Sequence, residues 1–93
     1  MSEQKIQAKI LQHLKANGFV ACKTITMNRA GILDIIACSP EGRYWEIEVK
    51  TPKGRASKLQ EVRVKQVRAN NGIAFIAYGY DDYLQQFNNS TVI

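Results

Sequence analysis

The sequence predicts an α/β fold in a single domain covering residues 1–93, with the element order helix, three strands, helix, strand, helix. Apolar residues recur at helical spacing in residues 3–16 and 57–70, whereas the segments between and after them are short and rich in β-branched and apolar residues. Ninety-three residues are enough for one hydrophobic core but not for two. We therefore expect one sheet packed against helices, without a linker or an internal repeat.

The first helix is expected over residues 3–16 and ends at Asn17-Gly18. Its apolar stripe consists of Ile6, Ile10, Leu11 and Leu14. Glu3 lies one turn before Ile6 on nearly the same face, which favours a carboxylate that extends the stripe towards the interior. An acid in the first turn also complements the helix dipole without any further role, and spacing alone does not separate the two interpretations.

Three strands are expected next, over residues 19–27, 31–38 and 44–50. The second is apolar on both faces except at Asp34, a pattern typical of a central strand that contains one buried charge. The loop over residues 39–43 has proline and glycine at the positions that a type I turn favours. The buried charge needs a partner of opposite sign.

A metal ion is one such partner. Alternation along the third strand places Glu46, Glu48 and Lys50 on one face of the sheet. A cation that bridges Asp34 and Glu48 would neutralise both acids, and carboxylate oxygens suit Mg²⁺ or Mn²⁺. Sharing an ion requires both acids on the same sheet face, so paired residue numbers in this hairpin must add up to an even number of about 82. We therefore expect a hairpin loop of three or five residues, or a bulge.

The second half of the chain begins with a helix that Ser57 and Gln60 open as a capping box and that runs to about Asn70. Its apolar residues spread around more than one face: Leu59, Val62, Val64 and Val67. This distribution favours contact with the sheet and with a second surface, such as another subunit.

A short apolar strand is expected over residues 73–78. Asp81 can cap a last helix that runs through Phe87. Residues 88–93 are expected to form a loose polar tail.

Thirteen basic and eight acidic residues give a net charge of +5, which favours an anionic partner such as nucleic acid. The loop Lys53-Gly54-Arg55 directly follows the acidic strand and could contact a phosphate backbone, although a solvated loop explains it equally simply. No apolar run approaches the length of a membrane span, and the N-terminus lacks a signal-peptide pattern. We expect a cytoplasmic protein, or one that acts in the host cytoplasm if it is phage-encoded.

The two cysteines, Cys22 and Cys38, stand in apolar runs without the spacing of a zinc site, and we expect both to be reduced core residues. His13 is the single histidine, so neither a histidine-based zinc site nor a histidine-containing triad is indicated. We expect His13 to be a helix-surface residue.

Several of these features together resemble a known superfamily. The element order, the strand with Asp34 and the triplet Glu48-Val49-Lys50 resemble the PD-(D/E)xK nucleases, whose αβββαβ core has a mixed central sheet flanked by helices. The small size and the combined motifs are most similar to stand-alone virus-type replication-repair nuclease (VRR-NUC) domains, over residues 2–80; these also resemble archaeal Holliday-junction resolvases. One departure is that Ile32-Leu33 stands where many superfamily members have proline before the aspartate.

The resemblance implies a divalent-metal site. Asp34, Glu48 and the backbone carbonyl of Val49 would bind Mg²⁺ or Mn²⁺, and Glu3 would reach the metal through water or bind a second ion. Lys50 would orient or polarise the attacking water and stabilise the negative charge that develops on the phosphate.

Gln60 would position Lys50 or the scissile phosphate. Each role has a simpler alternative, because Lys50 could only neutralise the two acids and Gln60 could only complete the capping box. Glu46 shares the face of Glu48 but matches no family position, so it is left out of the expected site.

The resemblance implies a metal-dependent, structure-specific DNA endonuclease that cuts branched DNA such as Holliday junctions. A four-way junction has approximate two-fold symmetry and needs two cuts, whereas the chain has one cluster of acids and lysine, so we also expect a homodimer. The candidate DNA contacts are Arg29, Lys53, Arg55 and Lys58. Two alternatives stay open. One is a catalytically silent nucleic-acid-binding module of the same fold, and the other is a nuclease that acts on flaps or plain duplex.

Overall fold

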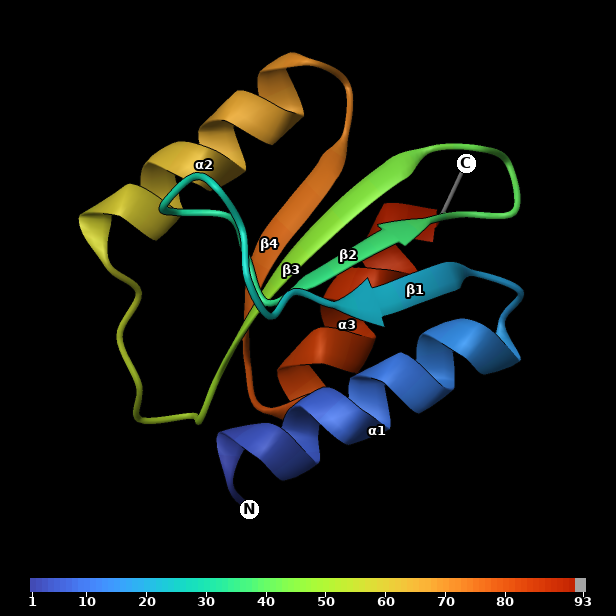
Figure 1. Ribbon diagram of the computed structural model, residues 1–93. Coiled ribbons are helices and arrows are strands. Elements are labelled where there is room, and N and C mark those ends of the chain that lie inside the picture. The colour runs from blue at the N-terminus through green and yellow to red at the C-terminus, as the bar shows by residue number, and fades with distance from the viewer. Residues whose placement is uncertain (92–93) are drawn as a thin grey trace.

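A computed structural model of the protein describes residues 1–91 (Figure 1). The predicted order of helix, three strands, helix, strand and helix is confirmed. The elements are α1 (Glu3–Ala16), β1 (Val20–Lys23), β2 (Ile35–Cys38), β3 (Tyr44–Lys50), α2 (Lys58–Ala69), β4 (Ile73–Tyr78) and α3 (Tyr80–Thr91).

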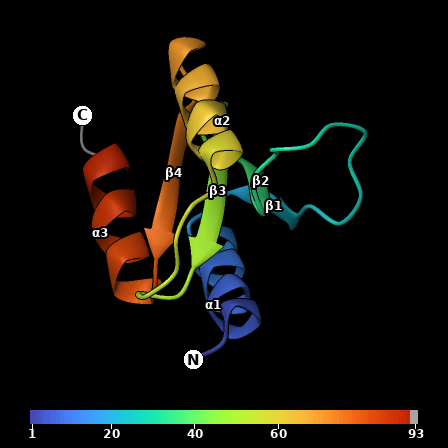
Figure 2. The same ribbon diagram turned by 90° about the vertical axis from the view of Figure 1, so that its left-hand side faces the viewer.

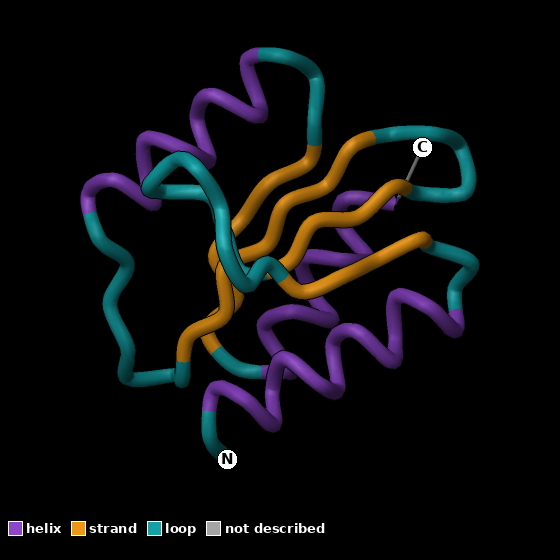
Figure 3. The backbone as a smooth tube through the Cα atoms, in the orientation of Figure 1, coloured by secondary structure: helices purple, strands orange, loops and turns teal. Residues whose placement is uncertain are grey.

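The four strands form one mixed sheet in the order β1-β2-β3-β4 (Figure 3). The first three strands are antiparallel to their neighbours, whereas β4 returns through α2 and pairs parallel with β3. Helices α1 and α3 pack on one face of the sheet and α2 packs on the other, so that α2 and α3 lie on opposite sides of β4 (Figure 2). The mixed, helix-flanked sheet that the resemblance implies is thus present.

Apolar side chains fill both faces unequally. The larger cluster joins α1 and α3 to the sheet and includes Trp45, Ile47 and Val49 from β3. The smaller cluster lies under α2 and consists of Leu33, Val64, Val67 and Ala74, with Ile76 against it. The alternation predicted for β3 is therefore correct: its apolar residues face α1 and α3, and its acids face α2.

The hairpin of β2 and β3 has the expected register. Ile35 pairs with Ile47 and Cys38 pairs with Tyr44, so that paired residue numbers add up to 82, across a five-residue loop over residues 39–43. Continuing this register by one position places Asp34 opposite Glu48. The register thus puts both acids on one face, as predicted, and the Val49 N–H donates to the Asp34 carboxylate across the hairpin (2.9 Å).

The first two strands are shorter than predicted. β1 ends at Lys23, and β2 begins only after Asp34. Thr24 ends the pairing: its N–H donates to the Asp34 carbonyl (2.8 Å) and its hydroxyl donates to the Leu33 carbonyl (2.9 Å). Beyond this point the loop of residues 24–34 extends away from the sheet (Figure 2), with Ile25 90% exposed. Asp34 thus lies immediately before β2 and not within it.

The last helix is longer than predicted. α3 begins at Tyr80, so Asp81 lies inside the helix and does not cap it. The helix continues to Thr91, because buried Phe87 keeps it against the core and the Thr91 hydroxyl donates to the Phe87 carbonyl (3.0 Å). The predicted polar tail is therefore wrong for residues 88–91, and residues 92–93 lie outside the described part of the chain.

Three side-chain predictions are corrected. Cys22 and Cys38 are free, as expected, but both are exposed, because they lie on the part of the sheet that α2 does not cover. His13 is half-buried: its Nδ1 lies 2.8 Å from the Tyr83 hydroxyl and its ring meets Phe87 edge-on. Burial lowers the pKa of His13.

Over residues 1–91, no helix combines the length and the apolar character needed to cross a membrane.

Replacing Gly31 by alanine should destabilise the fold more than replacing Gly42. Both residues have positive φ (+88° and +86°), so an L-side chain costs about 1–2 kcal/mol at either position. A Cβ atom at Gly31 would lie 2.8 Å from Leu59 Cγ, whereas at Gly42 nothing lies within 4 Å. Urea denaturation should show an extra loss of about 1–3 kcal/mol for Gly31→Ala. Equal losses would mean that Leu59 moves aside and does not hold the loop.

Candidate active site

Asp34 and Glu48 meet on the α2 face of the sheet. The N–H of Val49 donates to Asp34 Oδ2 (2.9 Å), which holds the Asp34 carboxylate against β3. Glu48 lies in β3 and is only 4% exposed. Two acids that precede and follow a hairpin loop are in this way brought together by backbone pairing.

Their proximity changes the ionisation of Glu48. Burial raises its pKa to about 7, and the negative charge of Asp34 acts in the same direction. The Lys50 ammonium opposes the rise, because it favours the ionised carboxylate. A site that holds two acids with so little compensation favours a bound cation.

Lys50 and Gln60 both contact the same oxygen of Glu48. Lys50 Nζ lies 3.5 Å from Glu48 Oε2, and Gln60 Nε2 donates to that oxygen at 2.9 Å. Gln60 Oε1 also accepts from the Ser57 N–H (2.9 Å), and Ser57 Oγ accepts from the Gln60 N–H, which completes the predicted capping box. The capping-box interpretation of Gln60 is therefore confirmed, and its other side-chain contact is with Glu48 and not with Lys50.

The donor set fits a hard divalent cation. Hydrogen bonds from the protein reach Asp34 Oδ2 and Glu48 Oε2, and among residues 1–91 none reaches the second oxygen of either carboxylate. In the same range no group of three or more His, Cys, Asp or Glu side chains could hold a metal. Mg²⁺ is commonly bound by one or two carboxylates and keeps several waters, so two acids, with the Val49 carbonyl and water, suffice.

Glu3 is the one expected catalytic residue that the structure does not join to the others. It is exposed in the first turn of α1, and no hydrogen bond or ion pair in the described chain links it to Asp34, Glu48, Lys50 or Gln60. Its position agrees with the helix-dipole interpretation. A role through water or a second ion stays a prediction.

The expected DNA contacts are all exposed: Arg29, Lys53, Arg55 and Lys58. They lie on the loop of residues 24–34, on the loop of residues 51–57, which leads from the end of β3 to the start of α2, and at the start of α2 itself (Figure 1). Gly31 packs against Leu59, and Gly54 packs against the stem of Lys50. These basic side chains are free of ion pairs within the described residues.

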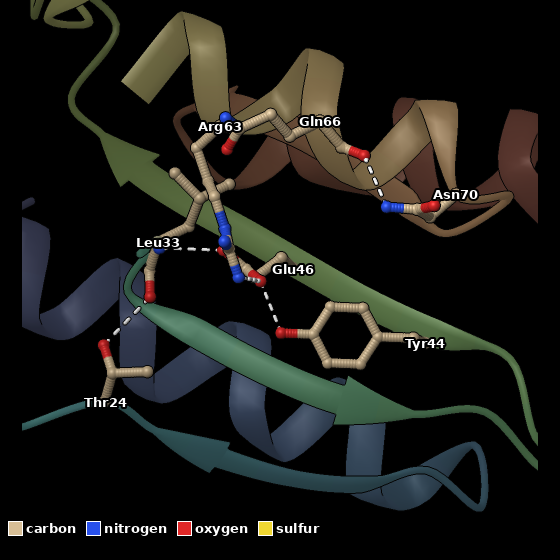
Figure 4. Close-up of polar contacts among 7 residues, drawn as sticks. All are labelled: Thr24, Leu33, Tyr44, Glu46, Arg63, Gln66 and Asn70. Atoms are coloured by element: carbon tan, nitrogen blue, oxygen red, sulfur yellow. Dashed lines mark hydrogen bonds and ion pairs between the residues drawn. The ribbon is translucent and has the colours of Figure 1, made fainter. Parts of the chain in front are cut away.

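Glu46 is the residue that sequence analysis missed. Its side chain is fully buried, and both its oxygens accept hydrogen bonds from Arg63 on α2 (2.8 Å each) (Figure 4). It also accepts from the Leu33 N–H (3.0 Å) and from the Tyr44 hydroxyl. Burial alone would raise the pKa of Glu46, but these donors together hold it below its ordinary value.

The sequence contained a signal for this network. Glu46 precedes Glu48 by two residues on one strand face, and Arg63 follows Gln60 by three residues on one helix face. If Gln60 faces Glu48, then Arg63 faces Glu46. The pairing was not predicted because Glu46 has no counterpart in the family pattern.

Comparisons with known proteins agree with the fold. No family model and no curated protein matches the chain. A solved structure described as a VRR_NUC domain matches with a TM-score of 0.81 at 20% identity, covering 92% of this chain and 94% of that one. A protein of unknown function from Silicibacter pomeroyi, SPO1766, matches with a TM-score of 0.54 at 22% identity, covering 84% of this chain and 52% of that one. The chain therefore has the fold of a VRR-NUC domain.

In the presence of a chelator, Glu48→Gln should stabilise the protein more at pH 8 than at pH 5. The folded state holds the Glu48 proton up to about pH 7, whereas the ordinary pKa is 4.5. Unfolding therefore releases this proton between those values, and the stability due to Glu48 falls as the pH rises through that window. Urea denaturation at both pH values measures the effect. A stability gain that is the same at both would contradict the raised pKa of Glu48.

Proposed function

We propose that this chain is a divalent-metal-dependent DNA endonuclease that hydrolyses phosphodiester bonds. The observation that carries the proposal is the meeting of Asp34 and Glu48, with the Lys50 ammonium 3.5 Å from Glu48, on the fold of a VRR-NUC domain. Two acids and a lysine at the edge of exposed basic loops combine a cation site with a phosphate site.

Each residue of the site has its own role in the proposed reaction. Asp34, Glu48 and the Val49 carbonyl would hold Mg²⁺ or Mn²⁺, which when bound polarises the phosphate and acidifies water. Lys50 places a positive charge where the phosphate oxygens become more negative in the transition state, and it orients the attacking water. Gln60 keeps Glu48 in place through its 2.9 Å hydrogen bond and is itself fixed by the helix cap.

A catalytically silent binding module is the alternative, and the geometry disfavours it. Two neighbouring carboxylates repel a phosphate backbone, and burying Glu48 beside Asp34 raises its pKa to about 7 at a cost in stability. A protein that only binds DNA gains nothing from this arrangement. A nuclease gains a cation site.

We further propose that the substrate is branched DNA, such as a Holliday junction, met in the cytoplasm of the cell or of a phage-infected host. The exposed basic residues lie on loops that suit contact with the phosphate backbone. Such contacts respond to the shape and direction of DNA arms and not to base sequence. Flaps and plain duplex are the competing substrates.

Alanine substitution of Asp34, Glu48 or Lys50 should abolish metal-dependent cleavage while leaving most DNA affinity, because the phosphate contacts come from other residues. Cleavage is measured on duplex, flap, fork and four-way-junction DNA with and without Mg²⁺, and binding is measured by fluorescence anisotropy in Ca²⁺. Glu41→Ala, which removes an exposed acid in the loop over residues 39–43, is the matched control and should cleave normally.

The four-way junction should be cut faster than the duplex. Cleavage by Asp34→Ala at the wild-type rate would overturn the metal site, and unchanged cleavage by Lys50→Ala would remove Lys50 from the mechanism. Preference for flap or duplex would refute the branched-DNA proposal alone.

The chain should be a homodimer, because a four-way junction has approximate two-fold symmetry and needs two cuts, whereas each chain has one acid pair. Val62 and Leu59 on α2 are 43% and 51% exposed and belong to neither core, so α2 offers an interface. Light scattering at micromolar concentration should report about twice the chain mass of 10.5 kDa.

Val62→Asp should dissociate the dimer, whereas Val20→Asp, on the uncovered part of the sheet, should not. The reverse result would move the interface to β1 and β2. A wild-type monomer that cuts both strands of a junction would contradict the dimer.

A further inference from the structure

Next to the acidic pair lies a polar network, built around one buried acid, that the proposed mechanism does not use. Its members are Glu46, Arg63, Tyr44 and the backbone of Leu33 (Figure 4). Glu46 lies at the centre, with no exposed surface, and receives two bonds from Arg63, one from Tyr44 and one from the Leu33 N–H. The hydrogen bond from Leu33 bears on the candidate site, because Leu33 directly precedes Asp34.

The backbone at Leu33 and Asp34 is fixed from two sides. The Glu46 carboxylate accepts from the Leu33 N–H at 3.0 Å, on the side of β3. On the side of β1, the Thr24 hydroxyl donates to the Leu33 carbonyl (2.9 Å) and the Thr24 N–H donates to the Asp34 carbonyl (2.8 Å). The Leu33 side chain is fully buried under α2. Because Asp34 lies outside the regular pairing of β2, these bonds take the place of strand pairing.

The same network also fixes α2 against β3. Glu46 and Glu48 project from β3 towards α2, and they are bonded by Arg63 and Gln60, which lie one turn apart on that helix. The ion pair between Glu46 and Arg63 thus fixes the position of α2 along β3 at which Gln60 contacts Glu48. Glu46 is therefore connected to Asp34 through the backbone of Leu33, and to Glu48 through α2.

Stability alone gives a weak reason for this network. Taking the Glu46 carboxylate fully out of water, and the Arg63 guanidinium partly, is costly, and an apolar pair of similar volume is often as stable. What an apolar pair cannot provide is an acceptor for the Leu33 N–H. We propose that Glu46, held by Arg63 and Tyr44, is a positioning residue that fixes Asp34 in the place where it binds a divalent cation together with Glu48. This inference rests on the proposed metal site.

Two double variants isolate the acceptor. Glu46→Met with Arg63→Leu replaces the ion pair by apolar side chains and leaves the Leu33 N–H without its partner. Glu46→Gln with Arg63→Leu has nearly the same shape, but its amide oxygen can accept from Leu33 and its amide NH₂ can donate to Tyr44. Both lack the charges, so the comparison depends on the hydrogen bonds of residue 46 with the Leu33 N–H and with the Tyr44 hydroxyl. If the Met variant does not fold, as judged by thermal melting, Glu46→Leu with Arg63→Leu replaces it.

Two properties are measured on the full chain: Mn²⁺ affinity by calorimetry, and hydrogen exchange of the Val49 amide by NMR in metal-free buffer. The Met variant should bind Mn²⁺ about tenfold or more weakly, as is usual when the partner of a metal ligand is lost. Its Val49 amide should exchange faster, because that amide donates to Asp34 Oδ2. The Gln variant should stay close to the wild type in both properties.

Ile10→Val, which weakens the core on the opposite sheet face, is the control for lost stability and should change neither property beyond the effect of global unfolding. Equal Mn²⁺ affinity and equal Val49 exchange in the Met and Gln variants would overturn the positioning role. If the wild-type chain binds no Mn²⁺, the proposed function fails. Val49 exchange then decides the positioning of Asp34 by itself, with faster exchange in the Met variant supporting it and equal exchange refuting it.

Discussion

The candidate site depends on one hydrogen bond, from the Val49 N–H to Asp34 Oδ2. Through it, the acid that precedes β2 is held against the strand that carries Glu48. The β2–β3 register, with its five-residue loop, brings the two acids to the same face. Without this register the chain would still have a core, because the larger apolar cluster lies on the other face of the sheet. The larger apolar core and the candidate site therefore lie on opposite faces of the sheet.

This separation explains why so small a domain tolerates buried acids. The cluster around Trp45 and Ile47, closed by α1 and α3, provides most of the apolar packing, whereas α2 covers a smaller cluster and leaves room for polar side chains. Glu46 is fully compensated by its donors, and its pKa is lowered. Glu48 is compensated only in part, and its pKa is raised. Of these two acids on one strand face, Glu48 is therefore the one suited to binding a cation.

Local patterns predicted much of this arrangement. Strand alternation and register are local rules. The side-chain faces of β3 and a β2–β3 loop with an odd number of residues were therefore predictable. The exposure of Cys22 and Cys38 was not, because it depends on how far α2 reaches across the sheet. The start of β2 was not predictable either, because it depends on Thr24, ten residues before Asp34. The bond from the Leu33 N–H to the Glu46 carboxylate joins residues thirteen positions apart, so no local pattern predicts it.

The central claim is that Asp34 and Glu48 bind one divalent cation together. A crystal of the wild-type chain grown with Mn²⁺ and measured for anomalous scattering tests it most directly. We expect an anomalous peak within coordination distance of an oxygen from each carboxylate, with water among the remaining ligands. A peak that contacts neither acid, or no peak at Mn²⁺ concentrations that support DNA cleavage, would contradict it.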